Sequence, residues 1–161
     1  MKGHSYDAEI VWKASGEFAK GRYSRAHVWR FDGGVEVPAS ASPSVVRVPY
    51  SLEEAVDPEE ALVAALSSCH MLTFLDIARH AGLMIEAYED KAVGVMGDLG
   101  DRRYWVEKVI LRPMITFKGD ALPDAALLQE LHEKSHKICF IANSVKTEIE
   151  IAPEPSKLVA G

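Results

Sequence analysis

The sequence predicts an α+β domain with antiparallel sheets, and three observations support that prediction. Short runs of alternating polar and apolar residues, separated by glycine, fill the first third of the 161-residue chain. One long apolar segment in the middle has the length and the end residues of a helix. Further alternating segments and one amphipathic segment follow it. The expected order is three strands, a long helix, two strands, a second helix and a closing strand.

The strands of the first third are expected at residues 6–13 and 23–31, and the turn sequence Asp32-Gly33-Gly34 follows the second of them. Residues 38–57 contain three prolines and several serines, which predicts an irregular connector with one short strand near 45–48. Since loops of this length are often functional, the connector is a candidate functional loop.

The central helix is expected over about residues 58–81. Asp57 can cap its first turn, Pro58 suits the first helical position, and Glu60 completes the spacing of a capping box. Gly82 is expected to end the helix. Apolar or small residues occupy nearly every side, which predicts a helix that is buried on all sides.

The second half is expected to contain a hairpin of two long strands, residues 82–98 and 104–117, joined by a turn at 98–101. An amphipathic helix at about 123–137 and a strand at 147–151 follow. We expect a single domain over residues 1–161, with 153–161 as a flexible tail.

Composition narrows the class of protein. Lys and Arg total 18 against 24 Asp and Glu, giving a net charge of −6, so no nucleic-acid partner is expected. The nearly uncharged run at 61–75 is shorter than the roughly 20 residues that cross a bilayer, so no membrane partner is expected either. The N-terminus lacks the apolar core of an export signal, which makes the cytoplasm the expected location.

Two cysteines, Cys69 and Cys139, are 70 residues apart. This spacing is typical of neither a disulfide scaffold nor a paired zinc site. Local context favours inert packing for Cys69, because a free cysteine in a helix usually behaves as a small apolar residue. Cys139 follows His136 and Lys137, two groups that favour a thiolate, but taken singly it too is expected to be inert.

The second predicted helix contains His132-Glu133-Lys134-Ser135-His136, which matches the H-E-x-x-H pattern of zinc hydrolases. Both histidines are expected beside the apolar stripe of Leu127, Leu131 and Ile138, where solvated residues usually lie. We therefore expect no metal, and a zinc hydrolase remains the less favoured alternative. A third ligand would have to be one of Cys139, Glu148, Glu150 and Glu154.

Two segments resemble the OsmC/Ohr family of thiol-dependent peroxidases. The first is residues 57–75, DPEEALVAALSSCHMLTFL, and the second is residues 136–145, HKICFIANSV. They occur in the family's order, and the segment 23–27, YSRAH, is similar to the OsmC-like branch. The resemblance implies the OsmC-like fold: antiparallel sheets around a long buried central helix, assembled as an intertwined homodimer.

The resemblance also implies a chemistry and its residues. Cys69 matches the peroxidatic cysteine, Cys139 the resolving cysteine and Glu59 a glutamate of the family motif, while Arg47 and Arg25 are the candidates for its arginine. The implied activity is antioxidant: organic hydroperoxides are reduced to alcohols through a Cys69 sulfenic acid and a Cys69–Cys139 disulfide. A dithiol reductant, of lipoyl type for example, would reset the pair, and no cofactor is expected.

The predicted helix places a constraint on this site. Glu59 and Cys69 are ten residues apart, about 15 Å along a helix axis, so they cannot touch within one helix. Either the helix is broken between them or Glu59 reaches the cysteine of a second subunit. Small residues along the helix would allow two copies to pack closely: Ala61, Ala64, Ala65, Ser67 and Ser68.

The alternative function, from another class of protein, is that of a non-catalytic dimer that binds an apolar ligand.

Overall fold

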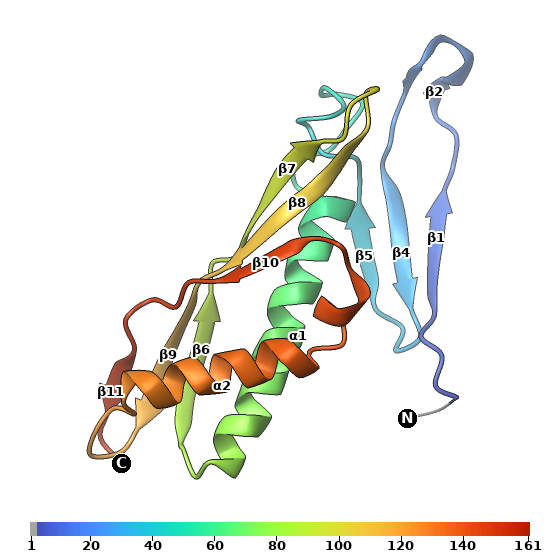
Figure 1. Ribbon diagram of the computed structural model, residues 1–161. Helices are drawn as coiled ribbons and strands as arrows, with labels where there is room; N and C mark the ends of the chain where they lie inside the picture. Colours follow the sequence, from blue (N-terminus) through green and yellow to red (C-terminus); the bar gives the residue numbers. More distant parts are fainter. Residues whose placement is uncertain (1–2) are drawn as a thin grey trace. The chain divides into compact units, whose positions relative to one another are not determined.

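The computed structural model describes residues 3–161, and its contacts divide the chain into two compact units. The first unit ends at Ala61 and the second is Leu62–Gly161. The architecture is α+β, with two helices and mostly antiparallel sheets, as the sequence predicts (Figure 1).

The first unit contains a three-stranded antiparallel sheet in the order β1-β4-β5, formed by Ala8–Trp12, His27–Phe31 and Glu36–Ala39. A small ladder joins β2, Gly16–Glu17, to β3, Arg22–Tyr23. The strand expected at 23–31 is therefore interrupted after Tyr23. The interruption has a physical cause, because the N–H of Arg25 donates to the carbonyl of Tyr50 and that of Ala26 donates to the Ser24 hydroxyl.

The connector after β5 is irregular, as expected, but it contains no strand at 45–48. The N–H groups of Val45 and Val46 both donate to the carbonyl of Ser42, and that of Tyr50 donates to Arg47. These turn hydrogen bonds use the groups that a strand would have offered to a neighbour, so the expected short strand is wrong.

Helix α1, Pro58–His80, has the capping box that the sequence predicts. The Asp57 carboxylate accepts from the N–H of Glu60 at 2.8 Å, and the Glu60 carboxylate accepts from the N–H of Asp57 at 3.2 Å. After the last turn, Gly82 has a φ of 78°, a conformation that favours glycine.

The expectation that α1 is buried on all sides is wrong for the single chain. Its buried residues, Leu66, His70, Phe74 and Ala78, repeat every four positions and so form one stripe. On another face Ala64, Ser68 and Leu72 are exposed, Leu72 by 64%. One chain supplies packing partners for one side of the helix only.

The hairpin expected in the second unit is present, but it is divided between two sheets. In one sheet β7, Val93–Asp98, pairs with β8, Tyr104–Leu111; in the other β6, Ile85–Asp90, pairs with β9, Pro113–Lys118. The side chain of Asp90 fixes the division. It accepts from the N–H of Arg112 at 2.7 Å and from the hydroxyl of Ser67 on α1.

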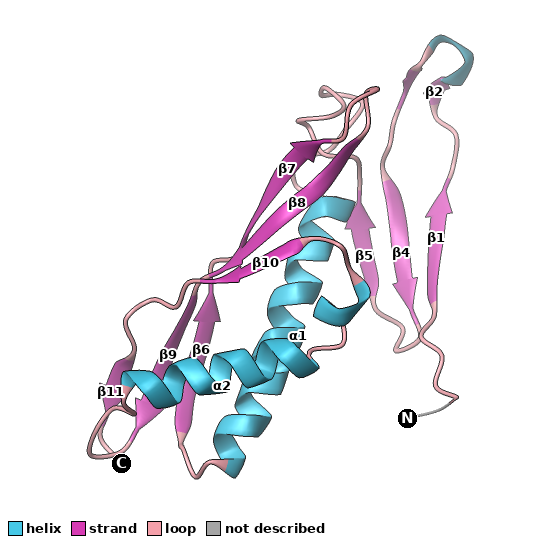
Figure 2. Cartoon of the chain, viewed as in Figure 1, coloured by secondary structure: helices cyan, strands magenta, loops and turns pink. Residues whose placement is uncertain are grey.

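Helix α2, Ala125–Ile138, begins at Asp124, whose carboxylate accepts from the N–H of Leu127 at 2.7 Å. Strand β10, Glu148–Ile151, then pairs with β8 and strand β11, Lys157–Val159, with β9, both in parallel. Residues 157–159 are thus part of a sheet, within the segment 153–161 that the sequence suggested as a flexible tail. Within the second unit α2 crosses α1 (Figure 2).

By length and composition, α1 could cross a membrane, and no other helix among residues 3–161 meets that criterion. Core helices of soluble proteins meet the same criterion, so the finding is weak evidence for a membrane protein. The expectation of no membrane partner stays a prediction.

Candidate functional site

The two cysteines meet where α2 ends against α1. The sulfur of Cys139 lies 2.6 Å from that of Cys69, and both cysteines are free thiols. Cys69 is half-buried in the middle of α1, whereas Cys139 is only 1% exposed. The expected proximity of the two sulfurs is confirmed, across 70 residues of sequence.

Local structure fixes Cys139 in this place. Its N–H donates to the carbonyl of Ser135, which closes the last turn of α2, and its sulfur accepts from the N–H of Ala142 at 3.4 Å. Burial, together with the hydrogen bond to Cys69, raises the pKa of the Cys139 thiol to about 11. At neutral pH Cys139 therefore keeps its proton and donates it to the sulfur of Cys69.

A pair of histidines lies in the same helix crossing. His70, the residue after Cys69, has its Nε2 3.1 Å from Nδ1 of His132 on α2, and the two rings stack at an angle of 10°. Both side chains are buried, so the expectation that His132 lies on a solvated flank is wrong. Ile138, expected in the apolar stripe, is 54% exposed. Periodicity alone missed His70 as a partner, because its partner comes from another helix.

The geometry does not favour the zinc alternative. Nδ1 of His132 already faces His70, and no group of three or more potential metal ligands gathers among residues 3–161. Zinc in proteins is usually held by at least three side chains. In the H-E-x-x-H segment, His132 instead packs against α1, and Glu133 is exposed on the surface of α2.

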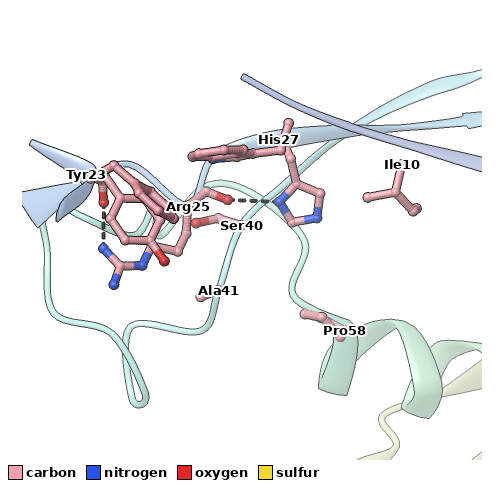
Figure 3. Close-up of a pocket in the computed structure, with 9 residues that line it drawn as sticks. Ile10, Tyr23, Arg25, His27, Ser40, Ala41 and Pro58 are labelled. Carbon is pink, nitrogen blue, oxygen red and sulfur yellow. Dashed lines mark hydrogen bonds between the residues drawn. The ribbon is translucent and has the colours of Figure 1, made fainter. Parts of the chain in front are cut away.

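A second candidate site lies wholly within the first unit. Trp12, Phe18 and Tyr23 form an aromatic cluster with ring centroids 4.7–5.8 Å apart, and they line a cavity of about 380 Å³ with Arg25 and His27. Figure 3 shows Tyr23, Arg25 and His27 around this cavity, with Pro58 at the start of α1 on another side. Its walls are mostly apolar, so it suits an apolar ligand.

Arg25 is held firmly in this pocket. Its guanidinium lies 3.7 Å from the centroid of the Tyr23 ring and donates to the carbonyl of Tyr23 (Figure 3). It also donates to the carbonyl of Gly21. The Arg25 carbonyl accepts from Nδ1 of His27, whose Nε2 accepts from the indole of Trp29.

The other predicted site residues are less constrained. Arg47 is exposed, with its guanidinium 5.9 Å from the Tyr50 ring, and Glu59 is half-buried in the first turn of α1. Within residues 3–161, Glu59 forms no ion pair with Arg25 or Arg47. Helix α1 is continuous from Pro58 to His80, which removes the possibility of a break between Glu59 and Cys69.

Comparisons with known proteins agree with this architecture. Residues 51–154 match the family OsmC, described as OsmC-like protein. The uncharacterised protein YmaD of Bacillus subtilis is 27% identical over 109 residues, which are 67% of this chain and 72% of YmaD.

Two solved structures extend the comparison. An OsmC-like protein of unknown function from Vibrio cholerae is 48% identical, with a TM-score of 0.90 over 94% of this chain and 99% of that one. An organic hydroperoxide resistance protein from Elizabethkingia anophelis has a TM-score of 0.65 at 18% identity over the whole of both chains, a likeness of fold alone.

Fold and site together define an α+β protein in which two free cysteines contact each other at a helix crossing. The family match covers more than half of the sequence. The chain belongs to the OsmC family of OsmC-like proteins.

Proposed function

We propose that this protein is a thiol-dependent peroxide reductase that converts organic hydroperoxides to alcohols. The observation that carries the proposal is the 2.6 Å separation of the Cys69 and Cys139 sulfurs. Two thiols held this close need only a small movement to form a disulfide. Membership of a family that includes organic hydroperoxide resistance proteins supports the choice of substrate.

In the proposed reaction the Cys69 thiolate attacks one peroxide oxygen and the O–O bond breaks. The alkoxide takes a proton and leaves as the alcohol, while Cys69 becomes a sulfenic acid. The Cys139 sulfur then attacks the Cys69 sulfur; hydroxide leaves with the Cys139 proton as water, and a disulfide forms. An external dithiol, for example of lipoyl type, reduces the disulfide by exchange.

The environment of the two sulfurs supports this division of roles. A thiol with a pKa of about 11 is a poor first nucleophile, so Cys139 suits the resolving role. Its S–H donates to the sulfur of Cys69, which keeps the two sulfurs in contact. Cys69 is also the more exposed of the two, which gives the peroxide access.

We also propose a homodimer in which Glu59 of one copy serves the cysteines of the other. Glu59 lies ten residues before Cys69 on one continuous helix, about 15 Å along the axis, so it cannot reach the cysteine of its own helix. The exposed row of Ala64, Ser68 and Leu72 offers a surface on which two helices could pack.

For the activating cation we favour Arg25 over Arg47. A guanidinium stabilises a thiolate best when its position is fixed, and Arg25 is fixed by stacking on Tyr23 and by two carbonyls. Arg22, the other early arginine, is paired with Glu17.

The proposed setting is the cytoplasm, whose reducing thiols would regenerate the enzyme. We propose no nucleic-acid or membrane partner.

A second candidate function is retention of an apolar ligand without turnover. The aromatic cavity around Trp12 and Phe18 supports it, because that cavity has the size and apolar walls of a ligand site.

Peroxide consumption separates the two functions. The purified protein is mixed with cumene hydroperoxide and dihydrolipoate, and peroxide loss is followed for the wild type and for Cys69→Ser. The peroxidase proposal predicts turnover by the wild type and at least about a thousandfold loss in the variant, because a serine hydroxyl is not ionised at neutral pH. Equal peroxide loss in both proteins would contradict the proposal, and tight retention of an apolar probe without turnover would favour the binder.

A further inference from the structure

The hydrogen bond between His70 and His132 is a polar contact inside an otherwise apolar helix crossing. Phe74 lies next to both rings, with its centroid 6.5 Å from that of His70 and 4.5 Å from that of His132. Leu131, beside His132, belongs to the same buried cluster. The two imidazoles are 1% and 5% exposed.

Helix packing alone does not require this pair. Nδ1 of His70 and Nδ1 of His136 are buried, and neither has a hydrogen-bond partner among residues 3–161. A buried polar atom without a partner costs free energy, so apolar side chains of the same size would hold the two helices at lower cost. Buried polar contacts of this kind can instead select one register, because a hydrogen bond tolerates less displacement than an apolar contact.

Register decides whether the sulfurs meet. His70 is the residue after Cys69 on α1, and Cys139 comes seven residues after His132, two helical turns along α2. A slip of α2 by one residue would move Cys139 by about 1.5 Å and turn it by about 100°. That displacement would take its sulfur out of reach of Cys69.

We propose that His70 and His132 are positioning residues for the two cysteines: their hydrogen bond fixes α2 on α1 in the register that holds Cys139 against Cys69. Among residues 3–161, neither imidazole is hydrogen-bonded to a cysteine sulfur. It acts by raising the effective concentration of one thiol at the other, and it rests on the proposed two-cysteine chemistry only for its biological purpose.

The test is the equilibrium between the dithiol and disulfide forms of the protein in a dithiothreitol redox buffer. The substitution His132→Leu removes the hydrogen bond and leaves Nε2 of His70 without a partner. We expect the disulfide-forming equilibrium constant to fall by about tenfold or more, from the cost of an unpaired buried polar group. The substitution His132→Asn retains a polar side-chain atom near the Nδ1 position and should restore the constant to within about threefold of the wild-type value.

A matched control separates register from stability. Leu128 lies one turn before His132 and packs on the same buried cluster. Leu128→Ala should lower the free energy of unfolding, as cavity mutations do, and leave the equilibrium constant within about threefold. Where His132→Leu alone fails to fold, the double apolar variant His70→Phe/His132→Leu replaces it, with the same expected loss.

The inference is overturned if His132→Leu, or the folded double apolar variant, forms the disulfide as readily as the wild type. It is also overturned if Leu128→Ala loses as much as His132→Leu, since a general loosening of the helices would then explain both. The equilibrium involves no peroxide, so the proposed peroxidase activity can fail while the positioning role stands, and the reverse holds as well.

Discussion

The cysteine pair and the histidine pair connect the same two helices, but they differ in what they leave open. The two histidines are buried and form a hydrogen bond with each other within the second unit. The cysteines lie at the end of α2, where Cys69 is half-buried and its sulfur accepts a hydrogen bond only from Cys139 among residues 3–161. In the proposed mechanism, the crossing of α1 and α2 therefore combines a histidine pair that holds position with a cysteine pair that reacts. The cysteine pair also needs a cation from another part of the protein.

The largest effect is expected from disrupting the surface that a second copy would cover. Ala64 is exposed in the single chain, so Ala64→Glu should cost a monomer almost nothing, whereas it would bury a charge in a helix-to-helix dimer. We expect the dimer to be lost, together with peroxide turnover, as measured by light scattering and by peroxide assay. Ala126→Glu, at an alanine that is also exposed on α2, is the control and should keep both. An active dimer of the Ala64→Glu protein would argue against the proposed assembly.

The histidine pair should make stability depend on pH. Burial is the main cause that lowers the pKa of both His70 and His132 to about 4 from the usual 6.5. The unfolded chain therefore binds protons first, so stability present above about pH 6.5 is lost as the pH falls toward 4. The loss between pH 7 and pH 4.5 should be about 2.5 kcal/mol for each histidine, since one pKa unit corresponds to about 1.4 kcal/mol. Urea unfolding at pH 7 and pH 4.5 measures it.

The double variant His70→Phe/His132→Leu is the control for that measurement. It lacks both titrating groups and should show a smaller decrease in stability over the same pH interval. An equal decrease in wild type and variant would assign the pH dependence to other residues.

The need of the cysteines for a cation can be tested on the two candidate arginines. Arg25→Met should lower the second-order rate of peroxide reduction by about a hundredfold, because the variant keeps the apolar stem but loses the charge that would stabilise the thiolate. Arg47→Met, at the exposed position, should lower it by less than about threefold. Stopped-flow rates at saturating reductant give the comparison, and the opposite order would assign the role to Arg47.

The smallest effect is expected from the cap of α2. Asp124→Ala removes the acceptor for the N–H of Leu127 and should lower the free energy of unfolding by about 1 kcal/mol. The cap lies at the opposite end of α2 from Cys139, so the peroxide rate should stay near the wild-type value. A large loss of rate would show that the cysteines depend on the whole helix and not on its histidine contact.

Sequence reasoning was most successful where the signal is local. The capping box at Asp57 and Glu60 and the ends of α1 depend on residues within one turn, and the structure contains them. The proximity of Cys69 and Cys139 came from family resemblance, since 70 residues separate them and no periodicity connects them.

The predictions that were wrong depend on tertiary contacts between segments that are far apart in the sequence. The long hairpin was divided because Asp90 bonds to Arg112 and to Ser67, a contact between distant segments. The helical wheel puts His132 beside the apolar stripe, which predicts a solvated flank, whereas in the structure His132 is buried against His70 of the other helix. The C-terminal residues pair with β9, a partner that lies about forty residues earlier and that the tail itself does not indicate.

Trapping the first intermediate tests the central claim most directly. Cys139→Ser protein is treated with one equivalent of cumene hydroperoxide in the presence of dimedone, and the adduct is located by mass spectrometry. Our account predicts one adduct per chain at Cys69, because attack on the peroxide does not need the resolving thiol. An adduct at Cys139 in the Cys69→Ser protein, with none at Cys69 in the Cys139→Ser protein, would contradict it.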